Sequence, residues 1–278
     1  MQFKHTQVYN FENALRGMRN PLDSWGKSDS CFGIVDVVNT DALTKVCDAW
    51  IERVPYEVEE YSKEYYDLLE QYQLMLVKQG VLRYYGEYDD LCEVAFLGPN
   101  DMNLAKTLIK AGPEHAKFMR QIFVSVDIAA PLYWWKEMDT YKIGTTANST
   151  STMHKLTSKP ITLSSFETDD YDEEWFRKTG IEAACDTWIE NNIIYFLETL
   201  REEYIKTGDK RYWKELIRWL PESYMQTRTW TANYAVLRNI YFQRKNHKLK
   251  EWNVFCQWVE DLPYAHELIL TGENDETN

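Results

Sequence analysis

The sequence lacks any long hydrophobic run. None of its stretches reaches the roughly 18 consecutive apolar residues that a membrane-spanning helix requires. The first twenty residues, MQFKHTQVYNFENALRGMRN, also lack the apolar centre of a signal peptide. We therefore expect a cytoplasmic protein, of cellular or viral origin, that does not bind membranes.

Closely spaced cysteines and the short motifs of common enzymes are absent as well. The five cysteines stand far apart and form no C-x-x-C pair: Cys31, Cys47, Cys92, Cys185 and Cys256. They are typical of reduced thiols, and we expect neither a disulfide framework nor a bound metal. The sequence contains no H-E-x-x-H, G-x-G-x-x-G or Walker motif, which argues against a zinc protease, a Rossmann dinucleotide site and a P-loop NTPase.

Positive charge is in short supply, because 31 Lys and Arg face 44 Asp and Glu and give a formal net charge of −13. Nucleic-acid-binding proteins gain affinity by neutralising phosphates, so this balance argues against a DNA or RNA partner. Residues 225–250 depart from the average, since they contain several cations and no acidic side chain. They indicate either a local site for a small phosphate-bearing ligand or a helix surface that pairs with acidic neighbours.

The sequence does contain enough apolar material for a substantial core, since 44% of its residues are hydrophobic and 15% are aromatic. Alternating or β-branched runs predict strands at 32–38, 121–130 and 223–231. Apolar residues at helical spacing predict helices at 39–54, 58–79, 100–112, 113–121, 181–208, 209–221, 233–244 and 248–262. We predict one helix-rich α+β domain over residues 1–270, built around a small, mainly antiparallel sheet, followed by a flexible acidic tail at 271–278.

A polar stretch, TYKIGTTANSTSTMHK at residues 140–155, directly follows the Trp-rich segment PLYWWKEMD. It has too few apolar positions for a core strand or a core helix. Its hydroxyls, its amide and the N–H groups of a turn can surround a phosphate, with Lys142 and Lys155 adding charge and Gly144 allowing close approach. We expect a loop that lines a ligand, and the alternative is a solvated surface loop.

A second candidate is a stripe on the predicted helix from residue 233. Asn233, Leu237, Ile240 and Arg244 fall on one face at helical spacing. The planar guanidinium at the end of this stripe can grip a phosphate or a carbonyl–NH edge with two hydrogen bonds. An ordinary amphipathic helix with a capping Asn explains the same pattern.

Three blocks of the sequence resemble the flavin-dependent thymidylate synthase family. The first, IFVSVDIAAPLYWWKEMD, is similar to the family's strand that leads through an Ala-Pro step into a helix. In the second, YKIGTTANSTST, Asn148 and Ser151 keep the family's Asn-x-x-Ser spacing. The third, RWLPESYMQTRTWTANYAVLRNIYFQR, has the family's pattern at Leu220, Pro221, Tyr224, Thr231, Asn233, Leu237, Asn239 and Arg244. The resemblance covers residues 110–155 and 215–260 and implies the family's fold.

The resemblance also implies a reaction. The family methylates C5 of the uracil ring of dUMP, with methylenetetrahydrofolate as one-carbon donor, reduced FAD as hydride donor and NADPH as reductant. The flavin carries the redox step, so no side-chain nucleophile is required. We therefore expect a homotetrameric flavoprotein of nucleotide biosynthesis, a methyltransferase that acts on a pyrimidine deoxynucleotide such as dUMP.

Individual residues take their expected roles from the same resemblance. Arg244 corresponds to the arginine that stabilises charge on the activated pyrimidine and is the expected catalytic residue. Ser125, Asn233 and Asn239 correspond to the hydroxyl and amides that contact the flavin. The residues expected to bind the nucleotide are Glu137, Lys142, Asn148, Ser149, Ser151, Thr152, His154 and Arg218.

The sequence departs from the family's pattern at several cationic positions. The Arg-His-Arg triplet is replaced by residues 140–142, Thr-Tyr-Lys, and Met153 and Ile217 stand where the family has arginines. Lys does not substitute for a flat, bidentate guanidinium. Two alternatives therefore stay open: a catalytically retired nucleotide-binding or regulatory protein on the same scaffold, and a flavin-free, folate-dependent pyrimidine nucleotide hydroxymethylase. The sequence does not distinguish dUMP from dCMP.

Overall fold

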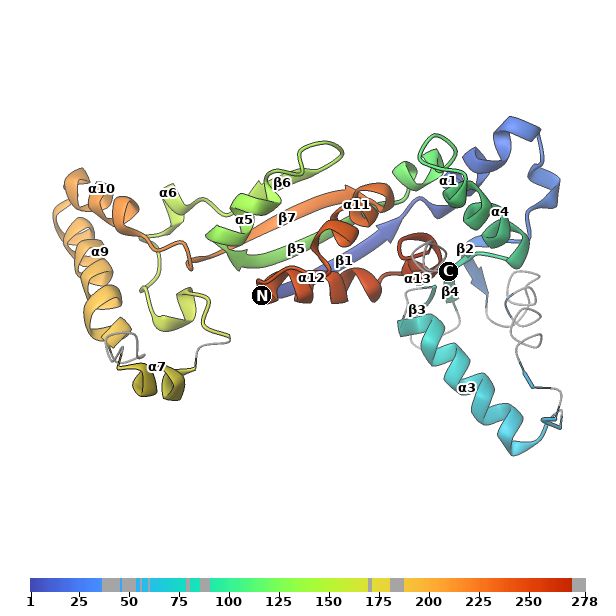
Figure 1. Ribbon diagram of the computed structural model, residues 1–278, viewed down its shortest axis with the longest axis horizontal. Helices are drawn as coiled ribbons and strands as arrows, with labels where there is room; N and C mark the ends of the chain where they lie inside the picture. Colours follow the sequence, from blue (N-terminus) through green and yellow to red (C-terminus); the bar gives the residue numbers. More distant parts are fainter. Residues whose placement is uncertain are drawn as a thin grey trace. The chain divides into compact units, whose positions relative to one another are not determined.

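The chain forms two compact units, each with its own core. The computed structural model describes residues 1–36, 46, 54–55, 57–59, 61–78, 81–85, 91–169, 172–180 and 188–271 (Figure 1). Unit 1 comprises Met1–Thr6 and Ser125–Thr231, and unit 2 comprises Gln7–Val124 and Ala232–Asn278. That residues 1–270 form a single domain stays a prediction, and the predicted tail at 271–278 lies, apart from residue 271, outside the described residues.

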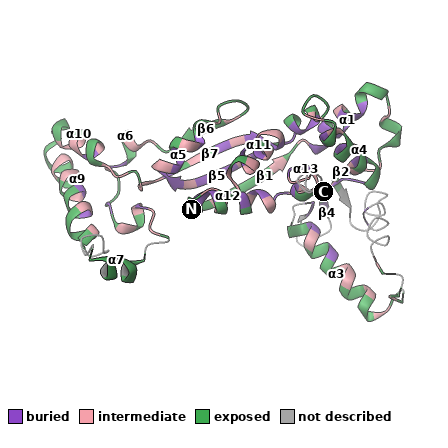
Figure 2. Cartoon of the chain, viewed as in Figure 1, coloured by how far each residue is buried: buried purple, intermediate pink, exposed green. Residues whose placement is uncertain are grey.

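A four-stranded sheet contains the strands that the sequence signals most clearly. Its order is β1 (Gln2–Tyr9), β5 (Phe123–Pro131), β7 (Met225–Asn233) and β6 (Thr146–Ser149). β5 and β7 alternate between buried and more exposed residues, as Figure 2 shows, which confirms the strands predicted at 121–130 and 223–231. β1 and β6 were not predicted, because neither has an apolar face to produce an alternating pattern.

Most helices of unit 1 belong to the segment between β6 and β7. The helices are α5 (Leu132–Met138), α6 (Thr152–Lys155), α7 (Glu173–Thr179), the π-helix η6 (Ile189–Ile194), α9 (Tyr195–Thr207) and α10 (Lys210–Trp219), with a 3₁₀ turn at Leu163–Ser165. α9 ends at Gly208, whose φ of 69° is left-handed and favours glycine. The helix predicted over 181–208 is confirmed where it is described, with η6 as a π-helix and α9 as an α-helix, and residues 181–187 lie outside the described residues.

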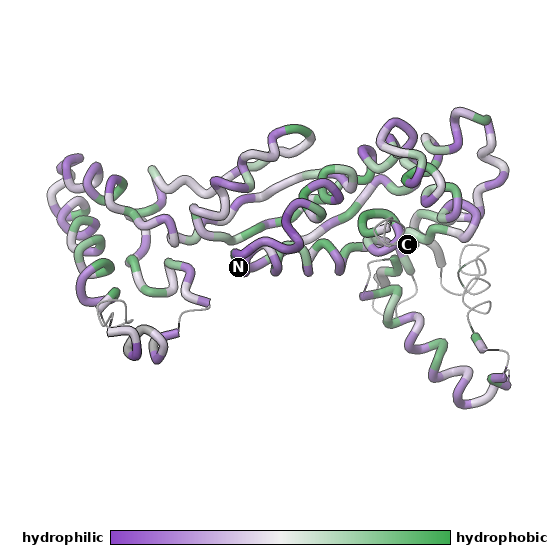
Figure 3. The backbone as a smooth tube through the Cα atoms, viewed as in Figure 1, coloured by the Kyte–Doolittle hydropathy of each residue, from purple (hydrophilic) through white to green (hydrophobic). Residues whose placement is uncertain are grey.

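The helical segment of unit 1 has its own hydrophobic core. The buried residues of this core are Leu156, Ile161, Phe166, Ile194, Leu197 and Leu216. α10 is largely hydrophilic in Figure 3, and it contributes Leu216 to the core from its inner face. Because α9 and α10 pack against each other, the amphipathic pattern of both helices is explained by this one core.

A partly buried ion pair joins α9 to the chain that precedes it. Arg201 Nε donates to Glu198 Oε2 at 2.8 Å, and the same oxygen accepts the N–H of Ile161 at 2.8 Å. Burial raises the pKa of Glu198, but the hydrogen bonds from Arg201 and Ile161 and the nearby positive charge outweigh burial and hold this pKa below its usual 4.5.

The substitution Glu198→Gln is expected to lower the free energy of unfolding by about 2 kcal/mol at neutral pH, because charge-assisted hydrogen bonds are lost. A pKa that is lower in the folded state contributes stability above the unfolded-state pKa, and this contribution disappears as the pH falls through the folded-state pKa. Urea unfolding should therefore show that the variant and the wild type differ less in their free energy of unfolding below about pH 4.5. Exposed Glu190→Gln is the control, and equal losses for both variants would contradict the prediction.

Unit 2 combines a three-stranded antiparallel sheet with helices from its two stretches of chain, Gln7–Val124 and Ala232–Asn278. The sheet order is β2 (Cys31–Asp36), β4 (Leu91–Phe96) and β3 (Leu82–Tyr85). The helices are α1 (Phe11–Arg19), α3 (Lys63–Lys78), α4 (Pro99–Lys110), α11 (Tyr234–Arg244), α12 (Lys250–Glu260) and α13 (Ala265–Leu268), with 3₁₀ turns at Asn20–Leu22, Trp25–Lys27 and Lys117–Gln121. The helices predicted at 58–79, 100–112, 233–244 and 248–262 are confirmed within these bounds.

Other predictions for unit 2 are confirmed in part or fall outside the described residues. The strand predicted at 32–38 is confirmed over residues 32–36. The second helix of the pair, predicted at 113–121, is confirmed in part, because residues 117–121 form a 3₁₀ helix. The helix predicted at 39–54 lies outside the described residues except for residues 46 and 54.

Helix-rich units around small antiparallel sheets confirm the predicted α+β class. Within the described part of the chain, no helix has both the length and the apolar character that a membrane span requires. Cys31, Cys92 and Cys256 are buried and form no disulfide, and Cys47 and Cys185 lie outside the described residues.

Candidate functional site

The polar stretch at residues 140–155 forms an exposed corner of unit 1. It leaves α5 through a turn in which Gly144 has a left-handed φ of 76°, runs as β6 along β7, and ends in the single turn of α6. The connection between α5 and β6 has a hydrophobic tip in Figure 3, and Ile143 within it is 92% exposed. The corner is therefore not a loop throughout, because residues 146–149 pair as an edge strand.

The strand register divides the predicted phosphate-binding residues between two faces of the sheet. Asn148 lies opposite Thr229, whereas Ser149 lies opposite Arg228. Successive strand residues point to opposite faces, so these two neighbours in sequence cannot address one ligand from the same side. Ser125 lies on the face of Asn148, since it is within 3.5 Å of Thr231 Oγ1 on β7.

Beyond the strand, the remaining residues of the corner belong to α6. Ser151 caps this helix by accepting the N–H of His154 at 3.2 Å, and Thr152 is its first residue. Lys142 and His154 are exposed, whereas Glu137 on α5 is half-buried. The corner thus presents hydroxyls and cations to solvent, as a phosphate site requires.

Arg228 is the cation that holds this corner in place. Its Nη1 donates to Asp139 Oδ1 at 2.7 Å, its Nε donates to Gln226 Oε1 at 3.0 Å, and its guanidinium carbon lies 4.2 Å from the ring centre of buried Trp135. Gln226 in turn donates to the carbonyl oxygen of Thr150 at 2.9 Å. These contacts connect the end of α5, β7 and the polar corner, so Arg228 positions the segment.

The substitution Arg228→Met is expected to lower the free energy of unfolding by about 2 kcal/mol and to speed amide hydrogen exchange at residues 146–151, because the ion pair and the Gln226 contact are lost together. Urea unfolding and exchange measured by mass spectrometry check both effects. Arg211→Met is the matched control, because Arg211 pairs with Asp209 on an exposed surface where ion pairs contribute little. Equal losses of stability and equal exchange rates in the two variants would show that Arg228 does not hold the corner in place.

α10 contacts the polar corner, but its predicted nucleotide-binding residue, Arg218, forms an ion pair within the helix. Trp213 Nε1 donates to the carbonyl oxygen of Met153 at 3.1 Å, which places α10 against α6. Arg218, predicted to bind the nucleotide, is exposed and forms an ion pair with Glu215 on its own helix. Ile217, where the family has an arginine, packs against the core of the helical segment.

In unit 2, α11 carries the other predicted residues. Asn233 is buried and caps the helix, because its Oδ1 accepts the N–H of Val236 at 3.0 Å. Asn239 is exposed and its Oδ1 accepts from Gln243 Nε2 at 3.0 Å. The guanidinium carbon of half-buried Arg244 lies 4.6 Å from the ring centre of Trp252 on α12, and Leu237 and Ile240 are buried between the two ends of the stripe. The stripe is thus both an amphipathic helix face and a set of oriented polar groups.

Sequence reasoning missed residues that orient the predicted ones. Arg228 shares a strand face with Gln226 and buried Trp230, and two polar side chains on the buried face of a strand are a signal that could have been noticed. Asp127 on β5 accepts from Thr229 Oγ1 at 2.5 Å and contacts His5 Nδ1 at 2.8 Å, and these hydrogen bonds lower the pKa of Asp127. His5 could not have been found, because nothing in the sequence predicts β1.

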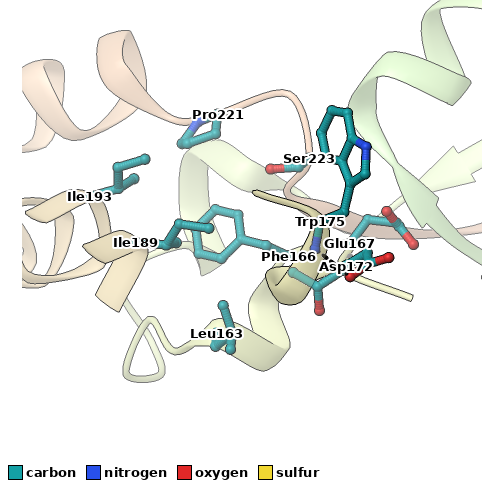
Figure 4. Close-up of a pocket in the computed structure, with 10 residues that line it drawn as sticks. Leu163, Phe166, Glu167, Asp172, Trp175, Ile189, Ile193, Pro221 and Ser223 are labelled. Atoms are coloured by element: carbon teal, nitrogen blue, oxygen red, sulfur yellow. Dashed lines mark hydrogen bonds between the residues drawn. The ribbon is translucent and has the colours of Figure 1, made fainter. Parts of the chain in front are cut away.

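A cavity of about 470 Å³ lies in the helical segment of unit 1 (Figure 4). Its lining residues are Leu163, Phe166, Glu167, Thr168, Asp172, Trp175, Ile189, Ile193, Pro221 and Ser223. Pro221 of the family's pattern lines it, but none of the residues expected to act in catalysis or to bind the nucleotide or the flavin does. Among the described residues, no group of three or more His, Cys, Asp or Glu side chains is arranged to hold a metal ion.

Comparisons with known proteins identify the fold. No protein-family model matches the sequence, and no curated protein shows a significant match. Two crystal structures of the flavin-dependent thymidylate synthase ThyX from Helicobacter pylori, both with FAD and dUMP, match with TM-scores of 0.52 and 0.51 at 15% identity. The first match covers 97% of this chain and 98% of the other, and the second covers 97% of each. The fold implied by the sequence resemblance is therefore confirmed over nearly the whole chain.

Proposed function

We propose that this chain, which has the flavin-dependent thymidylate synthase fold, binds FAD and transfers a one-carbon unit to C5 of a pyrimidine deoxynucleotide such as dUMP. The observation that carries the proposal is the fold match over 97% of the chain to proteins that hold FAD and dUMP. Residues 220–244 add support, because they keep the family's pattern on β7 and α11. Methylenetetrahydrofolate as one-carbon donor, NADPH as reductant and a homotetrameric assembly belong to the same proposal.

The chemistry of the described donors fits a flavin. The side-chain oxygens of Asn233 and Asn239 both accept hydrogen bonds within α11, from Val236 N–H and from Gln243. Their amide nitrogens are donors and suit the carbonyl and ring-nitrogen acceptors of an isoalloxazine. Half-buried Ser125 on β5 adds a hydroxyl that can donate or accept. When bound, the reduced flavin supplies the hydride that completes the methyl group.

The chain's own residues bind and polarise the nucleotide in this proposal. Ser151 and Thr152 begin α6, where a hydroxyl and backbone N–H groups can donate to phosphate oxygens, and Lys142 and His154 add donors nearby. Arg244, whose guanidinium carbon lies 4.6 Å from the ring centre of Trp252, stabilises charge on the polarised pyrimidine ring, whose C5 attacks the one-carbon donor. On β6, Asn148 contributes to the sheet face that carries Ser125, whereas Ser149 contributes to the face that carries Arg228.

A second candidate is nucleotide binding without turnover, and the ion pairs that arginines of unit 1 form within the chain favour it. Arg218 is paired with Glu215 and Arg228 with Asp139, and Ile217 is packed into the core where the family has a phosphate-contacting arginine. With the Arg-His-Arg triplet replaced, the corner has fewer guanidinium groups to hold FAD or a substrate in a reactive position.

The purified protein distinguishes these functions. A preparation that carries the visible absorption of an oxidised flavin, and whose melting temperature rises with FAD and with dUMP, supports the proposed function, because a ligand that binds the folded state stabilises it. Formation of dTMP from dUMP, methylenetetrahydrofolate and NADPH tests turnover. Stabilisation by dUMP or dCMP without flavin binding or product would favour the second candidate. Stabilisation by none of these ligands would reject both.

A further inference from the structure

The cavity of unit 1 has two chemically different sides. In Figure 4 the aliphatic side chains of Leu163, Ile189 and Ile193 lie on one side, and Glu167, Asp172 and Trp175 lie on the other. The aliphatic side is continuous with the core of the helical segment, since all three residues pack against that core. A volume of about 470 Å³ is within the range of pockets that bind small organic molecules.

The acidic side of the cavity is fixed in position by hydrogen bonds to the backbone. Glu167 Oε1 accepts the N–H of Asp169 at 2.9 Å, and the N–H of Glu167 donates to the carbonyl oxygen of Ser223 at 2.8 Å. Asp172 Oδ1 accepts the N–H of Trp175 at 2.9 Å. Two carboxylates are thus oriented at one cavity, and its described lining includes no Lys, Arg or His.

Aromatic rings complete the wall that a cation would meet. Phe166 and Trp175 both line the cavity, and Trp175 is 53% exposed, so its ring is accessible from solvent. An organic ammonium or guanidinium group is attracted both by carboxylates and by aromatic faces. An anion would instead meet the carboxylates of Glu167 and Asp172.

We propose that this cavity is a binding site for a small organic cation, one with an apolar body that fits against Leu163, Ile189 and Ile193 and an ammonium or guanidinium head that meets Glu167 and Asp172. The two carboxylates of the lining disfavour the phosphate of a nucleotide at this site. The proposal is therefore independent of the proposed function and concerns a different ligand class.

A matched pair of probes tests the charge requirement. Tryptamine and indole-3-acetate share an indole ring and differ in the sign of the charged group, and isothermal titration calorimetry on the full chain measures both. We expect tryptamine to bind and indole-3-acetate to bind at least about tenfold more weakly, because charge-assisted hydrogen bonds form only with the amine. Equal binding of the two probes, or binding of neither, would overturn the proposal.

Two isosteric variants test the residues. Glu167→Gln and Asp172→Asn each remove one charge, and the asparagine oxygen can still accept the Trp175 N–H. Each variant is expected to weaken tryptamine binding by about tenfold. Glu174→Gln is the matched control, because Glu174 is an exposed acid of α7 that pairs with Lys178 and does not line the cavity. If the control weakens binding as much as either variant, or if neither variant weakens it, the site is not where we place it.

Discussion

Replacing Arg244 by alanine is expected to reduce kcat/KM for the pyrimidine nucleotide by at least about 100-fold, or to abolish nucleotide binding. The reason follows from the role proposed for Arg244, because a guanidinium that stabilises charge developing on the pyrimidine lowers the free energy of the transition state more than that of the ground state. The guanidinium carbon lies 4.6 Å from the ring centre of fully buried Trp252, and this contact restricts the movement of the side chain. Turnover of dUMP and the dUMP-induced rise in melting temperature measure the two outcomes.

Two further variants separate charge from geometry at this position. Arg244→Lys keeps the positive charge and loses the planar fork, so we expect it to recover only a small part of the lost activity. Lys248→Ala removes an exposed cation from the same basic segment and should leave kcat/KM within about twofold of the wild type, since surface charges act weakly through solvent. An Arg244→Ala protein that binds and turns over normally would exclude Arg244 from the site.

The largest expected loss of stability comes from Asp101→Ala in unit 2. Arg19 Nε donates to Asp101 Oδ1 at 2.5 Å, and the two side chains are only 6% and 0% exposed. The other carboxylate oxygen accepts from the hydroxyls of Ser28 and Ser30, each at 2.5 Å. Removing one partner of a buried ion pair leaves the other charge uncompensated, which costs about 3–5 kcal/mol.

The position of Asp101 in the fold adds to this cost. It lies in the first turn of α4, where a negative charge interacts favourably with the helix dipole, and its own N–H donates to Asp29 Oδ1 at 3.1 Å. Urea unfolding of Asp101→Ala, Arg19→Met and the double variant should show that the two losses are not additive, because each single change already breaks the pair. Exposed Glu114→Ala is the control, and additive losses would contradict a coupled pair.

The parts of the fold that could be predicted from the sequence are those that produce a periodic pattern. β5 and β7 alternate because one face of each strand is buried, and α10 and α12 repeat at helical spacing because one face of each packs on a core. β1 and β6 could not be predicted, since an exposed strand is held by backbone hydrogen bonds that any side chain permits. The 3₁₀ turn at Lys117–Gln121 and the π-helix at Ile189–Ile194 differ from an α-helix in hydrogen-bond register, which side-chain spacing over one or two turns does not report.

For the candidate site, too, one part could be predicted from the sequence and another part could not. The sequence by itself determined which residue types are available at 140–155 and 220–244, and hence the resemblance that predicted the fold. Only the tertiary structure decided that Asn148 and Ser149 face opposite ways, that Arg218 is paired with Glu215, and that Arg228 holds the corner through Asp139 and Gln226. The reason is that residue identity and local spacing are encoded along the chain. Other features depend on segments that meet only when the chain folds, namely strand register, ion-pair partners and the cavity lined by Glu167 and Asp172.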